Sequence, residues 1–183
     1  MRSEIALTFV LLSGVAAQCG SPHWERATSD AGCAVDYPGA WYPGSGAGQI
    51  SIANFPPGSG AEGVVIGRGE ATISVFIPPT APSGSLGELA RWEARGDIDL
   101  IIRAVDLRPA YAGGCTAAVE SDSLNEVGPG AYQQETTYYC KISGNPIAIR
   151  LVNWRGDPRL AEYRSVLLRV AESLRPTLPQ GKH

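Results

Sequence analysis

Four cysteines are the side chains best suited to chemistry in this chain, at Cys19, Cys33, Cys115 and Cys140. No two of them form a C-x-x-C pair, so their spacing disfavours a zinc ribbon or a thioredoxin-like redox centre. An even number of cysteines in an exported chain favours disulfide bonds instead, with three connectivities open. We therefore expect these cysteines to be paired with one another.

Histidine is too scarce for the common catalytic and metal sites. The only two are His23, in a polar stretch near the N-terminus, and His183, the last residue. Neither place offers the rigid surround that a Ser-His-Asp, Cys-His or histidine-rich zinc site needs. The sequence also has no G-x-S-x-G and no Walker A motif. We expect no enzymatic activity, no cofactor and no metal.

The segment 58–63 (GSGAEG) matches the dinucleotide-binding pattern G-x-G-x-x-G in its letters. That fingerprint must open a helix whose N-terminus holds the pyrophosphate. Here β-like residues and a further glycine follow, at 64–67. The pattern therefore predicts a flexible loop and no nucleotide site.

The first 17 residues have the order of a secretory signal peptide. Arg2 gives a positive start, residues 5–15 are almost wholly apolar, and the small residues Ala16 and Ala17 close the run. A transmembrane helix needs roughly 20 apolar residues, and this run is too short. We expect cleavage before Gln18, a secreted or periplasmic protein, and no transmembrane segment in the mature chain.

A lipid-anchored envelope lipoprotein is the alternative for the same N-terminus. Cys19 follows the cleavage region, and Gly20-Ser21-Pro22 resembles the tether of such proteins. Against this, Gln18 stands where a small residue normally precedes the acylated cysteine, and acylation would leave an odd thiol. Soluble export is the preferred interpretation, and acylation at Cys19 stays open.

Charge and length limit the remaining classes. The formal net charge is −3 and the sequence pI is about 5.4, with no basic stripe of the kind that binds nucleic acid. The remaining chain is long enough for one domain with its own core. We divide it into an irregular N-terminal arm over 18–32, a domain over 33–176 and a C-terminal tail over 177–183.

Hydrophobic periodicity predicts an α+β domain with helices packed on a mainly antiparallel sheet. A capping box at Ser85 and Glu88 opens a helix that ends near Gly96, and Asp157 with Pro158 opens a second helix that ends at Pro176. Turns are expected at 43–48 and 143–146, and a glycine-rich loop at 56–69. The predicted strands span 33–37, 49–55, 70–77, 98–107, 115–121, 131–142 and 147–154.

The hairpin of the last two strands gives a candidate binding surface. With Gly144-Asn145 at its centre, Cys140 and Tyr138 fall on an apolar face. The opposite face then carries Glu135, Tyr139, Lys141, Arg150 and Trp154, with Tyr139 opposite Arg150. Aromatic and arginine side chains are typical of binding hot spots. The alternatives are an ordinary outer face with a cation–π pair, or a face covered by the first helix.

The same hairpin suggests a disulfide pairing. Cys140 lies on the apolar face, and Cys115 shares its face with Ala117 and Val119, which also reads as core. Cysteines on one face of neighbouring strands bring their Cα atoms to roughly 5.5 Å, which a disulfide accepts. We expect Cys115 to pair with Cys140, which leaves Cys19 to pair with Cys33.

The order of these elements resembles the PsbP-like domains. The resemblance is carried by Tyr37-Pro38-x-x-Trp41 after the first strand, the helix capped at Ser85, the long later hairpin and the closing helix, over Cys33 to Pro176. This superfamily includes an extrinsic subunit of photosystems, a Ran-binding import factor and exported lipoproteins, and the cysteines are not part of its pattern.

The resemblance implies a PsbP-like αβα sandwich and a non-catalytic binding or assembly role, towards an unidentified protein or small ligand of the cell envelope. Members bind different partners, so the fold alone does not choose among them. An envelope enzyme that works without histidine, through carboxylates or backbone groups, is the remaining alternative.

Overall fold

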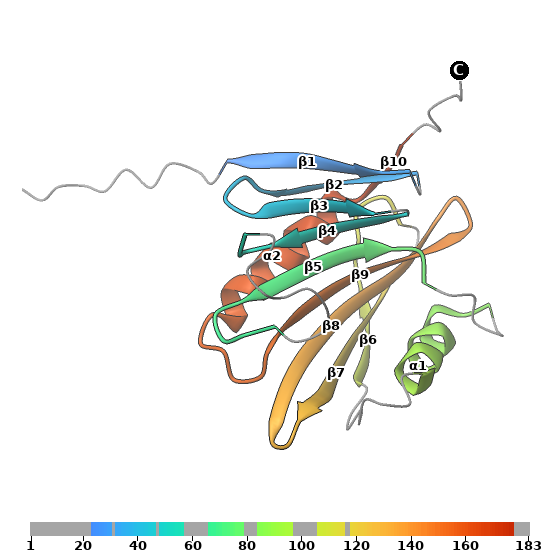
Figure 1. Cartoon of the computed structure of the whole chain (residues 1–183). Helices are drawn as coiled ribbons and strands as arrows, with labels where there is room; N and C mark the ends of the chain where they lie inside the picture. The colour runs from blue at the N-terminus through green and yellow to red at the C-terminus, as the bar shows by residue number, and fades with distance from the viewer. Residues whose placement is uncertain are drawn as a thin grey trace, which may run out of the picture.

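The computed structural model describes residues 23–30, 32–46, 48–56, 66–78, 84–96, 106–115 and 118–177. Strands make up most of this part of the chain, with two helices (Figure 1). The elements are β1 (Trp24–Ser29), β2 (Cys33–Pro38), β3 (Tyr42–Gly46), β4 (Gln49–Ala53), β5 (Ala71–Phe76), α1 (Leu86–Gly96), β6 (Asp106–Ala110), β7 (Ala118–Gly128), β8 (Ala131–Ile142), β9 (Asn145–Trp154), α2 (Leu160–Ser173) and β10 (Arg175–Pro176).

Two antiparallel sheets organise the fold. The larger has seven strands in the order β3-β4-β5-β9-β8-β7-β6, and the smaller has three in the order β1-β2-β10. Hairpins join most neighbours in the larger sheet, but β5 pairs with β9 across a long stretch of chain. That pairing sets the start of β5 beside the end of β9, with Ala71 opposite Asn153.

The main core lies between the larger sheet and α2. Alternate residues of β5 and β9, among them Ile73 and Leu151, point to this side because side chains of a strand alternate between its two faces. From α2, Tyr163 and Leu167 complete the core and are wholly buried. Helical spacing of these residues predicted that packing correctly.

The opposite face of the sheet is covered in part by α1. Leu89 and Ala90 of this helix pack on Tyr139 of β8 and Ala148 of β9. Figure 1 shows α1 and α2 on opposite sides of the sheet, so the predicted α+β sandwich with helices on both faces is confirmed. The capping box is also confirmed, since the Glu88 N–H donates to Ser85 Oγ over 3.2 Å and Ser85 Oγ donates to Glu88 Oε2 over 2.6 Å.

The Tyr37-Pro38-x-x-Trp41 motif ties β2 to the final helix. All three named residues are buried, and the Trp41 and Tyr163 rings meet edge to face with centroids 6.3 Å apart. The Trp41 N–H donates to the Pro38 carbonyl over 2.8 Å, which fixes the turn after the strand. The motif therefore serves the core.

Asp157 lies just before α2 but does not cap it as predicted, because the regular helix begins at Leu160 with Arg159 as its N-cap residue, and Pro158 lies in the turn before it. The Asp157 carboxylate accepts the N–H of Arg159 over 2.8 Å and the N–H of Gly69 over 2.6 Å. The Tyr163 hydroxyl donates to the Gly69 carbonyl over 2.9 Å. The two hydrogen bonds at Gly69 thus hold the turn before β5 against the start of α2, and the third fixes the turn that precedes the helix.

Glycine is required at one close approach. The Gly113 N–H donates to the Ala171 carbonyl over 2.7 Å, and the Gly114 N–H donates to the Leu174 carbonyl over 2.5 Å. A Cβ on Gly113 would lie 2.6 Å from the Leu174 oxygen, closer than any real contact. The segment before β7 can therefore lie against the end of α2 only without a side chain here.

Two predictions of irregular structure are wrong. The expected arm over 18–32 contains β1, and the expected turn over 43–48 contains β3. Both are outer strands of their sheets, where β1 shows only partial burial and β3 tolerates Pro43 because an edge strand can leave one N–H position unpaired. Short, polar or proline-containing edges carry little of the alternation that reveals a strand.

Other boundaries move. The strand expected over 115–121 is β7, which begins at Ala118 and runs on to Gly128. The strand expected over 98–107 lies mostly outside the described residues, as do the glycine pattern over 58–63 and the predicted signal peptide. No helix among the described residues is long and apolar enough to cross a bilayer.

Candidate functional site

The register of the β8–β9 hairpin differs by two residues from the predicted one. Ser143 and Gly144 form its turn, both with positive φ (51° and 87°), the geometry of a two-residue type I′ connection. Tyr139 therefore pairs with Ala148, and the prediction that it lies opposite Arg150 is wrong. A shift of two residues leaves every side chain on its predicted face, because strand side chains alternate with period two.

The predicted binding face is occupied by α1 where Tyr139 and Arg150 lie. Tyr139 is only 3% exposed, and its hydroxyl donates to the Glu93 carboxylate on α1. Arg150 pairs with Glu93 over 2.9 Å and with Glu135 over 3.5 Å, and stacks on Phe76 at 4.9 Å from the ring centroid. At Tyr139 and Arg150, therefore, the alternative that the first helix covers this face is the correct one.

The electrostatics of this cluster are those of an internal ion-pair network. Burial and the neighbouring Glu93 carboxylate both raise the pKa of Tyr139. Burial would lower the pKa of Arg150, but the carboxylates of Glu135 and Glu93 outweigh it and hold that pKa above its usual value. The network keeps the arginine charged and fastens α1 to the sheet.

Two further residues of the predicted face have internal partners. Glu135 accepts a hydrogen bond from Asn125 Nδ2 over 2.5 Å, and Lys141 Nζ donates to the Gly84 carbonyl, just before α1, over 2.7 Å. Both contacts join neighbouring elements of the domain. They leave Trp154 as the predicted residue that borders an open pocket.

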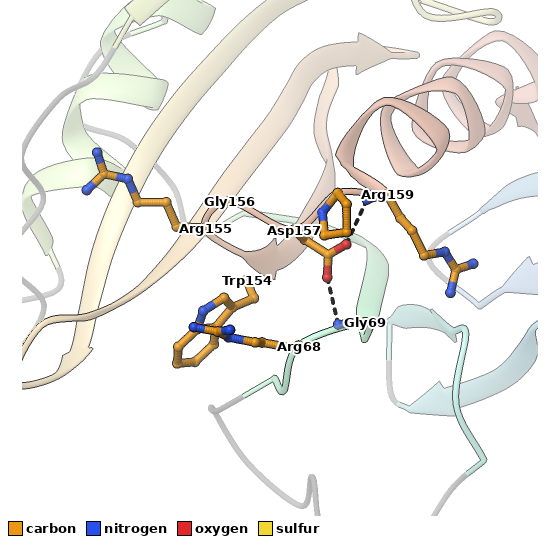
Figure 2. Close-up of a pocket in the computed structure, with 8 residues that line it drawn as sticks. Arg68, Gly69, Trp154, Arg155, Gly156, Asp157 and Arg159 are labelled. Atoms are coloured by element: carbon orange, nitrogen blue, oxygen red, sulfur yellow. Dashed lines mark hydrogen bonds between the residues drawn. The ribbon is translucent and has the colours of Figure 1, made fainter.

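Trp154 lines a pocket of about 340 Å³ between the turn before β5 and the start of α2. Figure 2 shows Trp154 and Arg68 on one side of it and Arg159 on the other, with Asp157 between them. The lining residues are Arg68, Gly69, Trp154, Arg155, Gly156, Asp157, Pro158 and Arg159.

Positive charge dominates this pocket. Its single carboxylate, Asp157, is buried and accepts the two backbone N–H groups described above. Arg159 pairs with Glu162 over 2.9 Å, and this hydrogen bond raises the pKa of Arg159. Arg155 lies over the Tyr132 ring at 5.4 Å from its centroid, and among the described residues neither Arg155 nor Arg68 has a carboxylate partner.

Of the residues that line this pocket, the sequence analysis named Trp154 as a candidate and did not name the three arginines. The run Trp154-Arg155-Gly156-Asp157-Pro158-Arg159 joins a strand to a helix and sets two arginines around a turn, which was the available signal. Arg68 gave no such signal, because it reaches the pocket only through the pairing of β5 with β9. The described residues hold no group of three or more His, Cys, Asp or Glu side chains that could bind a metal.

The Cys115–Cys140 disulfide is confirmed, with the two Cα atoms 5.7 Å apart. Cys115 lies in the turn before β7 rather than in the strand, and Ala118, the first residue of β7, pairs with Cys140. Cys33 is a free thiol in the core, 2% exposed, and burial raises its pKa. The predicted pairing of Cys33 with Cys19 is therefore not formed in this structure, and Cys19 itself lies outside the described residues.

No protein-family model and no curated protein matches the sequence. Solved structures do resemble the fold. The Ran-binding protein Mog1p of Saccharomyces cerevisiae is 8% identical with a TM-score of 0.56, over 85% of this chain and 96% of that one. Cyanobacterial PsbP (CyanoP) from Synechocystis sp. PCC 6803 is 16% identical with a TM-score of 0.50, over 90% of this chain and 98% of that one.

A protein from Bacteroides thetaiotaomicron VPI-5482 is 15% identical with a TM-score of 0.49, over 86% of this chain. This chain spans 50% of that protein's length.

The architecture defines an α+β domain with a helix on each face of an antiparallel sheet. More specifically, the chain has the PsbP/Mog1-like fold, as its structural similarity to Mog1p and CyanoP shows. The resemblance predicted from the sequence is thereby confirmed at the level of the fold. Identities this low carry no partner or activity from those proteins to this one.

Proposed function

We propose that this chain is an exported, non-catalytic binding or assembly protein of the cell envelope, and that it binds its partner at the pocket beside Trp154. The observation that carries this proposal is the open, arginine-lined pocket with an aromatic wall, formed by Arg68, Trp154, Arg155 and Arg159. Arginine and tryptophan are the side chains that contribute most to binding hot spots.

The fold supports a binding role in general terms. Its similarity to Mog1p, which is a Ran-binding protein, shows that this architecture can serve recognition. The pocket offers groups that bind and orient, while its carboxylate, Asp157, is engaged with backbone N–H groups. These features favour binding over catalysis.

A capture experiment tests the binding site. Trp154→Ala should abolish capture of a partner from an envelope extract while the fold is retained, and Tyr111→Ala, at an exposed aromatic residue, serves as the matched control. Thermal unfolding of both variants checks the fold. Equal capture of the partner by wild type and Trp154→Ala would refute binding at this pocket.

Export to an oxidising compartment rests on two separate features. The predicted signal peptide ends in small residues before Gln18, and the Cys115–Cys140 disulfide is of a kind that persists outside the cytoplasm. Intact mass spectrometry of the expressed protein should give a chain that begins at Gln18. Recovery of a full-length cytoplasmic protein with reduced cysteines would contradict soluble export.

A lipid anchor at Cys19 is a second candidate, and the environment of Cys33 favours it. Cys33 is buried in the core as a free thiol and behaves there as a small hydrophobic side chain, so it needs no partner. If Cys19 is acylated, the thiol left without a partner is that of Cys33, which is buried and therefore not exposed to oxidants. A mass that begins at Cys19 and carries diacylglycerol and a fatty acid, lost in Cys19→Ala, would establish the anchor in place of soluble export.

A further inference from the structure

We infer that the pocket beside Trp154 binds a small ligand through an oxyanion, a phosphate or carboxylate group, with an apolar ring of the ligand against the Trp154 indole. The inference rests on the proposed function, because it names the chemical class of ligand for the same pocket. It follows from the charges that line the pocket, from the state of its carboxylate and from its size.

The charges favour an anion. Arg68, Arg155 and Arg159 all line the pocket, and the first two have no carboxylate partner among the described residues. The planar guanidinium group of arginine presents donors in a fork that matches the oxygens of a phosphate or carboxylate, and such charge-assisted hydrogen bonds are stronger than neutral ones. An anion would therefore find two guanidinium groups that pair with no carboxylate in the described part of the chain.

The single carboxylate of the pocket does not offset this preference. Asp157 accepts the Gly69 N–H with one oxygen and the Arg159 N–H with the other, over 2.6 and 2.8 Å. Because its oxygens already have donors, it is poorly placed to hold a cation. The second of these contacts satisfies the Arg159 N–H just before α2, and we assign the binding of the ligand to the arginine side chains.

The shape of the pocket sets the kind of ligand. A volume of about 340 Å³ lies at the lower end of the range for small-molecule sites, roughly 300–1,000 Å³. The half-buried Trp154 ring provides an apolar wall beside the arginines. The combination suits a compact molecule with one ring and one anionic group.

The framework around the pocket is fixed before a ligand arrives. Gly69 is held by Asp157 through its N–H and by the Tyr163 hydroxyl through its carbonyl, and Tyr163 is wholly buried in the core. Arg68 therefore extends from a turn whose backbone is anchored to α2. A preformed site loses less conformational entropy on binding than one that must be ordered by its ligand.

The test is a titration of the full mature protein with phenyl phosphate, benzoate, inorganic phosphate and benzylamine. Binding is followed by NMR through the indole N–H signal of Trp154, assigned by comparison with Trp154→Phe. We expect saturable shifts with phenyl phosphate or benzoate, weaker binding of inorganic phosphate and no saturation with benzylamine. The stronger of phenyl phosphate and benzoate distinguishes a phosphate ligand from a carboxylate one.

Variants then separate the pocket from general surface charge. Arg68→Gln and Arg155→Gln should each weaken binding by about tenfold, the loss expected for one charge-assisted hydrogen bond. Arg169→Gln is the matched control, because Arg169, like Arg155, lies over an aromatic ring, 4.0 Å from the Trp24 centroid, but outside the pocket. It should bind as wild type does.

Two results would overturn the inference. One is the absence of saturable binding for every anionic probe, and the other is an equal loss in Arg169→Gln and the pocket variants. Failure of this inference is distinguishable from failure of the proposed function. If no anion binds but Trp154→Ala still fails to capture the partner, the pocket binds a protein partner, and only the inference of an anionic ligand fails.

Discussion

Reduction of the Cys115–Cys140 disulfide should destabilise the domain by an amount that follows from the loop it closes. The two cysteines are 25 residues apart in sequence. In the chain-entropy model a loop of that length restricts the unfolded chain enough to stabilise the folded state by ~3.5 kcal/mol. We expect reduction to lower the free energy of unfolding by about this amount.

The assay is urea unfolding followed by tryptophan fluorescence, in a Cys33→Ala background with and without reductant. Cys33→Ala removes the other described cysteine, so that Cys115–Cys140 is the bond whose loss is measured. Non-reducing peptide mapping must first show the bond. If the bond is present and its reduction changes the free energy of unfolding by less than ~1 kcal/mol, the loop-entropy reasoning is refuted for this protein.

A companion substitution decides the second pairing. If Cys33 is the free core thiol that the structure shows, Cys19→Ala leaves the free energy of unfolding unchanged. If the two cysteines are bonded instead, the lost loop should cost ~3 kcal/mol in the same model. The measurement uses the same urea titration, with wild type and Cys33→Ala as references.

Three further substitutions test the packing and the electrostatics. Gly113→Ala forces a Cβ against a backbone carbonyl at the end of α2 and should cost ~3 kcal/mol or more by urea unfolding, whereas Gly87→Ala, which meets only the tip of an arginine, should not destabilise. Tyr163→Phe removes a buried hydroxyl that donates to a carbonyl and should cost ~1–2 kcal/mol in the same assay, a prediction that an unchanged midpoint would contradict. The hydrogen bond to Arg175 lowers the pKa of Asp36, so its contribution is present above roughly pH 4 and is lost below it. Asp36→Asn should therefore show a smaller fall in Tm than wild type between about pH 5 and pH 3, and parallel curves would refute this.

The elements that the sequence predicted are those whose pattern is set locally. Residues 71–76 alternate because one side of this strand meets the core, and Ser85 with Glu88 forms a capping box within one turn of chain. The Cys115–Cys140 disulfide could also be predicted from the sequence, because the apolar neighbours of Cys140 placed it on the core side of its strand. Each of these signals lies within a few residues and needs no knowledge of distant contacts.

The elements that escaped prediction depend on distant partners or on fine turn geometry. β1 and β3 gain their structure by pairing with β2 and β4 at the sheet edges, where polar, glycine and proline residues hide the strand pattern. The hairpin register turned on whether Ser143 could adopt a positive φ, which is uncommon for a residue other than glycine. The burial of Tyr139 under α1 could not be predicted, because the sequence does not show on which face of the sheet that helix packs.

The location of the pocket follows from how this fold uses its sheet. One face is filled by α2 and the opposite face is partly covered by α1, so recognition is best placed at the ends of the strands. Because β5 and β9 are antiparallel neighbours, the turn before β5 and the turn after β9 meet at one end of the sheet. That meeting brings Arg68 to Trp154 and Arg155 without using a single core residue. Substitutions of the arginine side chains in these two turns, Arg68 and Arg155, should therefore change what the pocket binds while leaving the free energy of unfolding nearly constant, in contrast to substitutions at Asp157 or Tyr163.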